Sequence, residues 1–194
     1  MHVACFLRTR HFARRLSPPS ISPAQRRMNR NLYVMMGITG SGKSTVGAGL
    51  AKALGVDFVE GDDYHPSENV RRMAAGIPLT DADRADWLRS LAVRLREASE
   101  SGAGIVVTCS ALKRSYRDLL RAAAPDVQFV YLRGSRALIA ERVAERRDHF
   151  MPASLLDSQL ATLEQPESDE RAWTCDIKDP PQQIVDDIMA RAST

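Results

Sequence analysis

The chain has 194 residues, enough for one domain with a sizeable core, and its composition is ordinary for a globular protein. Its net charge of +3 is unevenly distributed: residues 1–30 hold seven arginines and no Asp, Glu or Lys, and without them the 27 basic residues fall to 20, against 24 acidic ones. The remaining chain is mildly acidic and has no apolar run of membrane-spanning length, which argues against nucleic-acid and membrane partners.

The arginine-rich residues 1–30 also contain several Ser and Pro residues, and this composition predicts a disordered extension. We expect the folded domain to cover residues 31–194. The extension has the composition of an organelle transit peptide. We favour an upstream start codon instead, with the natural protein beginning at Met28, directly before the first predicted strand.

A phosphate-binding loop is the most specific motif in the chain. Residues 37–44 read GITGSGKS and match G-x-x-x-x-G-K-[ST], the P-loop. An apolar strand is predicted before it, over residues 32–36, and a helix after it, over residues 44–54, which is the context that the motif requires. The nucleotide-binding prediction covers Gly37, Ile38, Thr39, Gly40, Ser41, Gly42, Lys43, Ser44 and Thr45.

The chemistry of this loop follows from its main chain. Glycines let backbone N–H groups turn inward onto a phosphate chain, and the N-terminus of the following helix adds partial positive charge. We expect Lys43 to reach the β- and γ-phosphates and the Ser44 hydroxyl to ligate Mg²⁺.

Short apolar runs alternate with amphipathic segments over the rest of the chain. Further strands are predicted over residues 57–60, 105–109, 127–132 and 173–177. Further helices are predicted over residues 67–73, between Thr80 and Gly102, and over residues 114–123, 135–147, 153–163 and 181–192. Thr80, with Asp83 three residues later, is typical of a capped helix start. The alternation predicts an α/β fold of three layers, in which a parallel five-stranded sheet is covered by helices on both faces.

A P-loop by itself indicates only binding of a nucleoside triphosphate. Switch GTPases need an Asn-Lys-x-Asp guanine reader and a D-x-x-G segment, and neither string occurs. Motor ATPases need an apolar strand that ends in an acidic residue, whereas the best apolar strand here ends in Cys109. The sequence therefore favours a small-molecule kinase that uses ATP and Mg²⁺, with the metal held by Ser44, phosphates, water and a carboxylate from elsewhere.

Asp62 is the candidate for that carboxylate. It follows the second predicted strand, so we expect it at the same carboxyl edge of the sheet as the P-loop. A carboxylate there can accept a proton from an attacking hydroxyl or ligate Mg²⁺ through water. The competing interpretation is a turn or helix-capping residue, a role for which Asp63 is the better candidate.

Three further blocks of sequence resemble the gluconate kinase family. Residues 62–87 read D-D-Y-H-P-x-x-N-x-x-x-M-x-x-G-x-P-L-x-D-x-D-R-x-x-W. Residues 109–113 read CSALK and are followed by Tyr-Arg-Asp at 116–118; the third block holds His149-Phe150, Ser158-Gln159, Leu163-Glu164 and Pro166. The resemblance covers nearly all of residues 32–190. It departs from the family at Thr80, where Asn is expected, and at Ala85-Asp86, where a proline is usual.

This resemblance implies ATP-dependent phosphorylation of D-gluconate at its 6-hydroxyl, giving 6-phospho-D-gluconate. It also implies the three-part build of nucleoside-monophosphate and shikimate kinases: a core, a substrate-binding helical insertion and a mobile lid. The small-molecule partner would then be gluconate, a carboxylate with five hydroxyls. Its pocket should hold cations and hydrogen-bonding groups.

Arg84 is the candidate for a bidentate clamp on the gluconate carboxylate, with an ion pair to Asp81 or Asp83 as the competing interpretation. His65 is a candidate donor to a sugar hydroxyl. The substrate-binding prediction comprises Asp62, His65, Arg71, Arg84, Lys113 and His149. The catalytic prediction comprises Lys43, Asp62, Lys113 and Arg146, and the metal ligands are expected to be Ser44 and Asp62.

Arg142 and Arg146 are four residues apart, on one face of a predicted helix. We expect them to fold over the nucleotide when the lid closes, where Arg146 would stabilise charge in the transition state. His149 begins the expected lid loop, whose closure would exclude water. The competing interpretation is a solvated basic face paired with Glu141 and Glu145.

Two rival functions stay open. One is another small-molecule kinase on the same scaffold, of the shikimate or nucleotide type; the other is a non-catalytic ATP-binding regulator. The cysteines, Cys5, Cys109 and Cys175, show no paired or metal-ligand spacing and suit a reducing cytosol, so we expect a cytoplasmic protein. The oligomeric state is left open, with a homodimer among the options.

Overall fold

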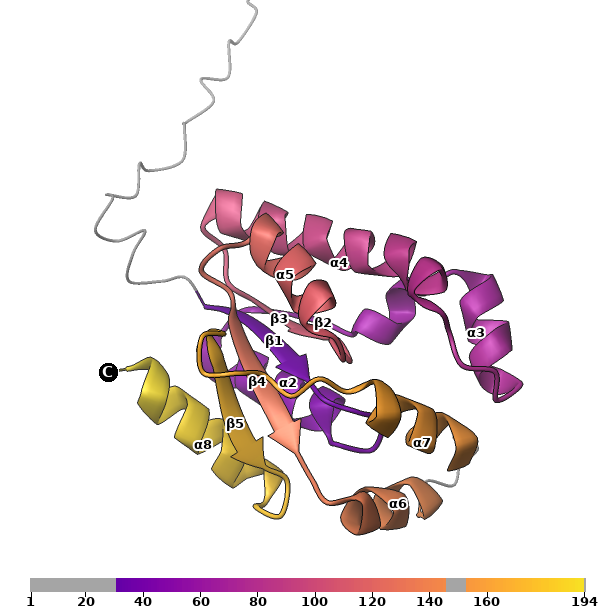
Figure 1. The fold of residues 1–194 in the computed structure, drawn as a ribbon. Coiled ribbons are helices and arrows are strands. Elements are labelled where there is room, and N and C mark those ends of the chain that lie inside the picture. Colours follow the sequence, from indigo (N-terminus) through magenta and orange to yellow (C-terminus); the bar gives the residue numbers. More distant parts are fainter. Residues whose placement is uncertain (1–30, 146–152, 194) are drawn as a thin grey trace, which may run out of the picture.

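The computed structural model describes residues 31–145 and 153–193 (Figure 1). Five parallel strands form one sheet in the order β2-β3-β1-β4-β5. The strands are β1 (Leu32–Met36), β2 (Asp57–Val59), β3 (Ile105–Thr108), β4 (Gln128–Arg133) and β5 (Ala172–Asp176). Because all strands are parallel, their carboxyl ends meet at one edge. The predicted α/β architecture is confirmed, whereas the expectation of disorder in residues 1–30 lies outside the described residues.

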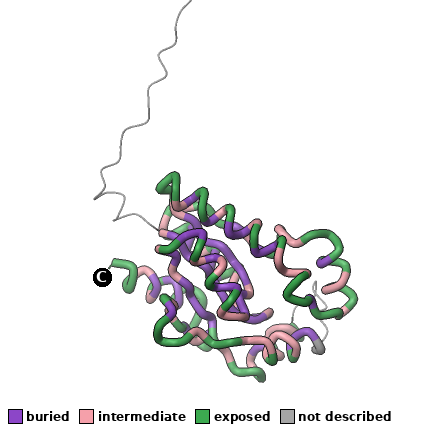
Figure 2. Tube along the Cα trace, turned by 45° about the horizontal axis from the view of Figure 1, so that its top comes forward, coloured by how far each residue is buried: buried purple, intermediate pink, exposed green. Residues whose placement is uncertain are grey.

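Helices cover both faces of the sheet, as Figure 2 shows by the buried strands between more exposed helices. On one face, alternate residues of β1, Leu32 and Val34, share a core with α4 (Asp81–Ser101) and α5 (Arg114–Ala123). On the other face, Tyr33 and Met35 share a core with α2 (Lys43–Leu54) and α8 (Pro181–Ala192). Burial on both faces explains why β1 is continuously apolar.

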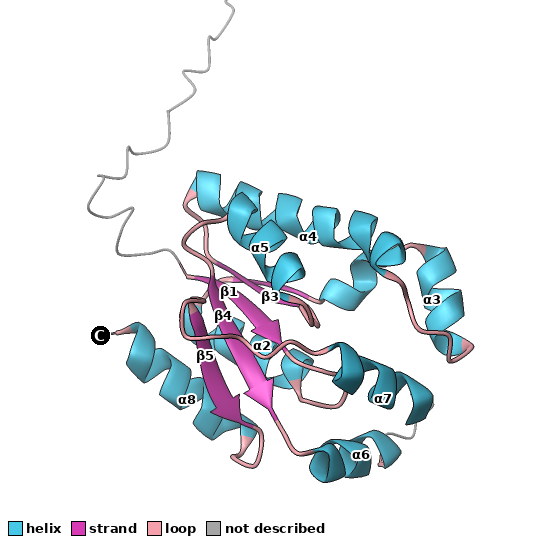
Figure 3. Cartoon of the chain, viewed as in Figure 1, coloured by secondary structure: helices cyan, strands magenta, loops and turns pink. Residues whose placement is uncertain are grey.

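The remaining helices lie toward the carboxyl edge of the sheet (Figure 3). They are η1 (Gly61–Tyr64), α3 (Ser67–Ala74), α6 (Arg136–Ala144) and α7 (Ala153–Thr162). Helix α3 is joined to α4 by the Asn69 side chain, which donates to the Asp83 carbonyl at 2.6 Å. Helix α3 and the start of α4 therefore form one unit, in the position expected for a substrate-binding insertion.

Helix α4 begins as predicted. The Asp83 N–H donates to the Thr80 hydroxyl, and the Asp83 carboxylate accepts from the Thr80 N–H at 2.7 Å, which completes a capping box. Such a cap stabilises a helix by about 1 kcal/mol. Gly102 ends α4 in the left-handed conformation, with φ of 73°. No helix among the described residues is both long enough and apolar enough to span a membrane.

The second strand is shorter than its predicted range of residues 57–60. The Glu60 carboxylate accepts a hydrogen bond from the Thr108 hydroxyl, and the Gly61 N–H donates to the same hydroxyl oxygen at 2.9 Å. These side-chain bonds replace the main-chain ladder, so β2 ends at Val59 and the chain turns into η1, where a loop was predicted. The chain therefore leaves β2 at the edge where β1 ends.

Candidate active site

The P-loop connects β1 to α2 and presents main-chain donors. Gly42 is the N-cap of α2, has a left-handed φ of 91°, and leaves the helix without a side-chain cap. The first-turn residues Ser44 and Thr45 are exposed, and the first turn carries no acidic residue. The leading N–H groups of α2 are not used within the helix, so this terminus suits an anion such as a phosphate.

Close packing holds the loop in place. A Cβ added at Gly40 would lie 2.8 Å from a Val143 methyl carbon, so the loop lies directly against α6. On the same helix, the Arg142 guanidinium donates to the Ile177 carbonyl at 2.7 Å and lies 3.9 Å from the position of a Cβ at Gly42. Arg142 therefore lies beside the P-loop.

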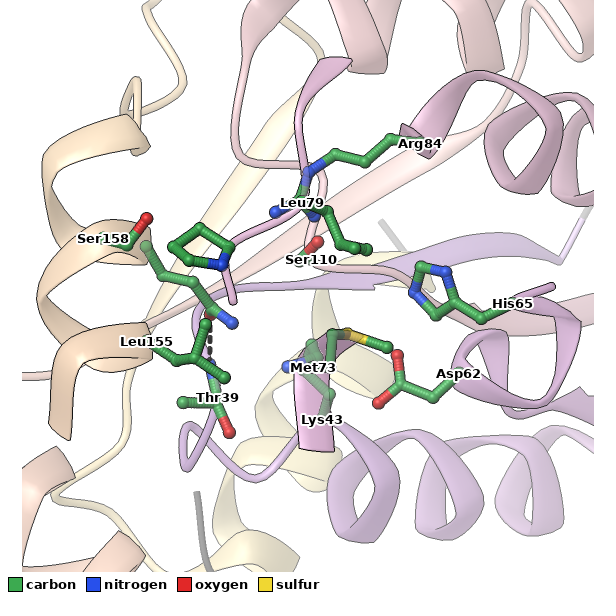
Figure 4. A pocket seen from close by; sticks show the side chains of 12 residues that line it. Thr39, Lys43, Asp62, His65, Met73, Leu79, Arg84, Ser110, Leu155 and Ser158 are labelled. Atoms are coloured by element: carbon green, nitrogen blue, oxygen red, sulfur yellow. Dashed lines mark hydrogen bonds between the residues drawn. The ribbon is translucent and has the colours of Figure 1, made fainter. Parts of the chain in front are cut away.

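One cleft joins the P-loop to four other segments (Figure 4). Lys43 lines it from α2, and Ser110 lines it from the loop after β3. Asp62 and His65 lie on one side of the view, and Thr39 and the α7 residues Leu155 and Ser158 lie on the other. Helix α3 adds Met73, the link to α4 adds Pro78 and Leu79, and the start of α4 adds Arg84. Lys43 also donates to the Ile38 carbonyl at 3.1 Å.

Asp62 lies in η1, directly after β2, and is exposed to the cleft. Neither η1 nor α3 has a side-chain hydrogen bond at its N-cap, so neither Asp62 nor Asp63 caps a helix, although both lie in the short turn of η1. A carboxylate and the Lys43 ammonium therefore share one cleft, as an acid–base or metal-assisted reaction requires.

His65 is held in a fixed orientation by Trp87. The two rings stack with centroids 4.2 Å apart and planes 15° apart, and the Trp87 indole donates to the Gly61 carbonyl at 2.7 Å. Burial lowers the pKa of His65; Asp62 works against that shift and Arg84 adds to it. The imidazole is therefore neutral near pH 7, and its Nδ1 finds no partner among the described residues.

Arg84 lies in the first helical turn of α4 and lines the cleft. The two carboxylates that could have paired with Arg84 form other ion pairs. Asp83 pairs with Arg72 at 3.2 Å, and Asp81 pairs with Lys113 at 2.7 Å. Within residues 31–145 and 153–193, Arg84 forms no ion pair. A guanidinium in this position can receive a carboxylate in a bidentate geometry.

Two predicted site residues lie apart from the cleft lining. The Lys113 ammonium donates to both Asp81 oxygens, at 2.8 and 2.7 Å, and Tyr116 donates to the same carboxylate at 2.6 Å. These bonds lower the pKa of Asp81, with the hydrogen bond from Lys113 as the largest cause. Arg71 is exposed and pairs with Glu68 within α3. The structure therefore does not bring Lys113 or Arg71 into the cleft.

Comparison with known proteins identifies the family. A family model described as an AAA domain matches residues 32–166. A gluconokinase from Gluconobacter oxydans is 49% identical over 156 residues, which cover 80% of this chain and 88% of that protein. The chain belongs to the gluconokinase family.

Further members of the gluconokinase family agree with this assignment. The thermosensitive gluconokinase of Escherichia coli is 42% identical over 142 residues, covering 72% of this chain and 74% of that protein. A solved structure of a gluconokinase from Sinorhizobium meliloti has a TM-score of 0.78 and 48% identity, covering 85% of this chain and 93% of that one. The chain is thus an enzyme of the kinase class with the fold of P-loop kinases, which use ATP.

Several cleft residues of this gluconokinase family member had no predicted role. Ser110, Ser158 and Gln159 line the cleft with polar side chains, and Met73 and Leu79 supply apolar surface. All five lie inside the sequence blocks that resemble the family, so a signal was present. Two predicted residues, Arg146 and His149, lie outside the described residues.

Proposed function

We propose that this protein transfers the γ-phosphoryl group of ATP to the 6-hydroxyl of D-gluconate, giving ADP and 6-phospho-D-gluconate. The observation that carries the proposal is the shared cleft, in which the P-loop residue Lys43 and the side chains of Asp62, His65 and Arg84 line one space. The relatives named gluconokinases support the choice of acceptor. We propose that residues 31–194 carry this activity.

The nucleotide side of the proposal rests on main-chain donors. Leading N–H groups of α2 and the Lys43 ammonium would bind the β- and γ-phosphates, and Arg142 would add positive charge from α6. The phosphate chain would be surrounded by the P-loop segment, which comprises Gly37, Ile38, Thr39, Gly40, Ser41, Gly42, Lys43, Ser44 and Thr45. A γ-phosphoryl group bound in this way would face the rest of the cleft lining.

Mg²⁺ fits the oxygen donors present. Ser44 supplies an exposed hydroxyl at the start of α2, and Asp62 supplies a carboxylate in the cleft. In sites of this kind Mg²⁺ is bound through one or two carboxylates, substrate phosphates and several waters. When bound, Mg²⁺ would neutralise charge on the phosphate oxygens.

The acceptor side rests on side chains. Arg84 would hold the gluconate carboxylate, since a guanidinium matches a carboxylate with two parallel hydrogen bonds. Neutral His65, fixed by Trp87, would exchange a hydrogen bond with a sugar hydroxyl. Asp62 would accept the proton of the 6-hydroxyl as that oxygen attacks the γ-phosphorus in line with the leaving ADP oxygen.

Some predicted roles stay predictions within this proposal. Lys113 would act on the substrate only after exchanging its bonds to Asp81 for one to a ligand. Arg71 would need to leave Glu68. The proposed roles of Arg146 in catalysis and His149 in acceptor binding, the mobile lid, a homodimeric assembly and a cytoplasmic location also stay predictions.

The test is an acceptor panel. ADP release is measured with D-gluconate, shikimate, AMP and no acceptor, for the wild-type protein and for Lys43→Ala. We expect release that depends on gluconate and is absent with the other acceptors. Release that follows shikimate or AMP would favour another small-molecule kinase. Wild-type release no greater than that of Lys43→Ala with every acceptor would favour the non-catalytic regulator.

A further inference from the structure

Helix α7 places two polar residues, Ser158 and Gln159, next to the buried Leu155 at the cleft. Leu155 and Leu156 are buried; Leu156 belongs to the core cluster that includes the P-loop residue Ile38, and the partly buried Leu160 packs against that cluster. The spacing of these leucines places Gln159 on the same face, while Asp157 is exposed on the outer face. Packing alone would favour a leucine at position 159, because burying apolar surface is favourable.

The Gln159 side chain makes a specific bond to the P-loop. Its Oε1 accepts the Thr39 N–H at 2.8 Å, across 120 residues of sequence. Thr39 lies in the middle of the phosphate-binding loop, so Gln159 fixes the orientation of a peptide unit in that loop. The contact is between a side-chain carbonyl and a main-chain N–H, which also assigns the two ends of the amide.

Because Oε1 faces Thr39, the amide NH₂ group lies on the other branch of the side chain. Gln159 lines the cleft together with Lys43 and Asp62. No hydrogen bond from its NH₂ group occurs within the described part of the chain. Two N–H donors are thus available beside the P-loop, in the cleft that Lys43 also lines and where the γ-phosphoryl group is expected.

We propose that Gln159 binds the γ-phosphoryl group through Nε2 while its Oε1 positions the Thr39 peptide of the P-loop. A neutral donor suits phosphoryl oxygens, whose negative charge strengthens an N–H···O bond. The same N–H groups would stay hydrogen-bonded to those oxygens as negative charge spreads over them in the transition state. This proposal rests on the proposed function and adds Gln159 to its site. The predicted effect on nucleotide binding does not depend on which acceptor is phosphorylated.

Two substitutions separate the donor from the acceptor of this side chain. Gln159→Leu removes both and leaves an apolar residue that suits the inner face of α7. Gln159→Glu keeps an oxygen for the Thr39 N–H but removes the donors and places negative charge toward the cleft. Gln183→Leu is the matched control, since Gln183 is exposed on α8 and bonds only to Asp187 among the described residues.

Affinities for ADP and for the non-hydrolysable ATP analogue AMP-PNP are measured with all three variants, together with kcat and Tm. We expect Gln159→Leu and Gln159→Glu to weaken AMP-PNP binding about tenfold and ADP binding less than about threefold. We expect kcat with gluconate to fall about tenfold to a hundredfold. Gln183→Leu should match the wild-type protein, and Gln159→Leu should lower Tm, because the part-buried Thr39 N–H loses its acceptor.

Equal weakening of ADP and AMP-PNP binding would overturn the γ-phosphoryl contact and leave Gln159 as a support of the P-loop alone. A Gln159→Glu variant with wild-type kcat and AMP-PNP affinity would also overturn it. If Gln159→Leu does not fold, the Gln159→Glu comparison decides. If wild-type protein fails to phosphorylate gluconate but the selective loss of AMP-PNP binding is found, the acceptor assignment fails and the role of Gln159 stands.

Discussion

The two sides of the cleft are built from different parts of the polypeptide. The nucleotide side is one continuous stretch, residues 37–45, and its phosphate donors are mainly main-chain N–H groups at the start of α2. The acceptor side collects Asp62, His65 and Arg84 from η1, from the residue after it, and from α4. Most side-chain substitutions leave the main-chain N–H donors in place, whereas each proposed contact with the gluconate molecule depends on one side chain. The acceptor side should therefore be the easier one to change selectively.

The largest effect is expected at Lys43, whose ammonium would bind the β- and γ-phosphates. Lys43→Ala should lower kcat about a thousandfold, because it removes a cation from the transferring phosphoryl group. The exposed Lys52 at the end of the same helix provides the control Lys52→Ala. Steady-state ADP release checks both, with Tm measured because Lys43 also bonds to the Ile38 carbonyl. Equal rates for the two variants would contradict the prediction.

Arg84 should give the next largest effect, confined to the acceptor. Arg84→Ala should raise KM for gluconate about tenfold to a hundredfold, because a charged hydrogen-bonding partner of the carboxylate is lost. KM for ATP should change less than about twofold, and Arg84→Lys should recover part of the loss. Arg89→Ala, at an exposed position of the same helix, is the control. A parallel rise in both KM values would show that the two sides are not separable.

Substitution of Lys113 tests how far the acceptor side of the cleft extends. Since Asp81 holds its ammonium outside the cleft lining, we expect Lys113→Met to change kcat/KM for gluconate less than about fivefold. The same kinetic assay checks this, with Arg84→Ala as the reference. A loss as large as that of Arg84→Ala would mean that Lys113 leaves Asp81 and takes part in the reaction.

His65 should give the smallest effect, seen in stability against pH. Its pKa is lowered in the folded protein by burial and by Arg84, and raised in part by Asp62. The unfolded chain, with an ordinary histidine pKa of about 6.5, therefore binds the proton more readily. This contribution to stability is complete above about pH 6.5 and is lost as pH falls through the lowered folded pKa.

The measurement is Tm at a series of pH values from 8 to 5. The wild-type protein should lose more Tm across this range than His65→Gln, which cannot take up the proton. Identical pH profiles for the two proteins would contradict a lowered pKa at His65.

Sequence reasoning succeeded where the interacting residues are neighbours in the chain. The strand, loop and helix of the P-loop lie within one stretch, and the capping box of Thr80 and Asp83 spans three residues. The position of Asp62 followed from the parallel sheet, because strands of that kind end at one edge. Local patterns and the parallel arrangement were sufficient for these features.

Sequence reasoning did not anticipate pairings between segments that are far apart in the chain. The ammonium of Lys113 is bound by Asp81, 32 residues earlier in the chain, while its role in the site stays a prediction. Gln159 received no role, because its partner Thr39 lies 120 residues away. Neither pairing has a spacing that a local pattern can indicate; each depends on how α4 and α7 lie against the sheet.

The most direct test of the account is to follow the γ-phosphoryl group itself. ATP labelled at the γ-phosphate is incubated with the protein and D-gluconate, and the product is examined by phosphorus and proton NMR. The account predicts that the label moves to gluconate in a one-to-one ratio with ADP, with the phosphate on the 6-hydroxyl. Label released as inorganic phosphate at a rate independent of gluconate, or bound to another hydroxyl, would contradict it.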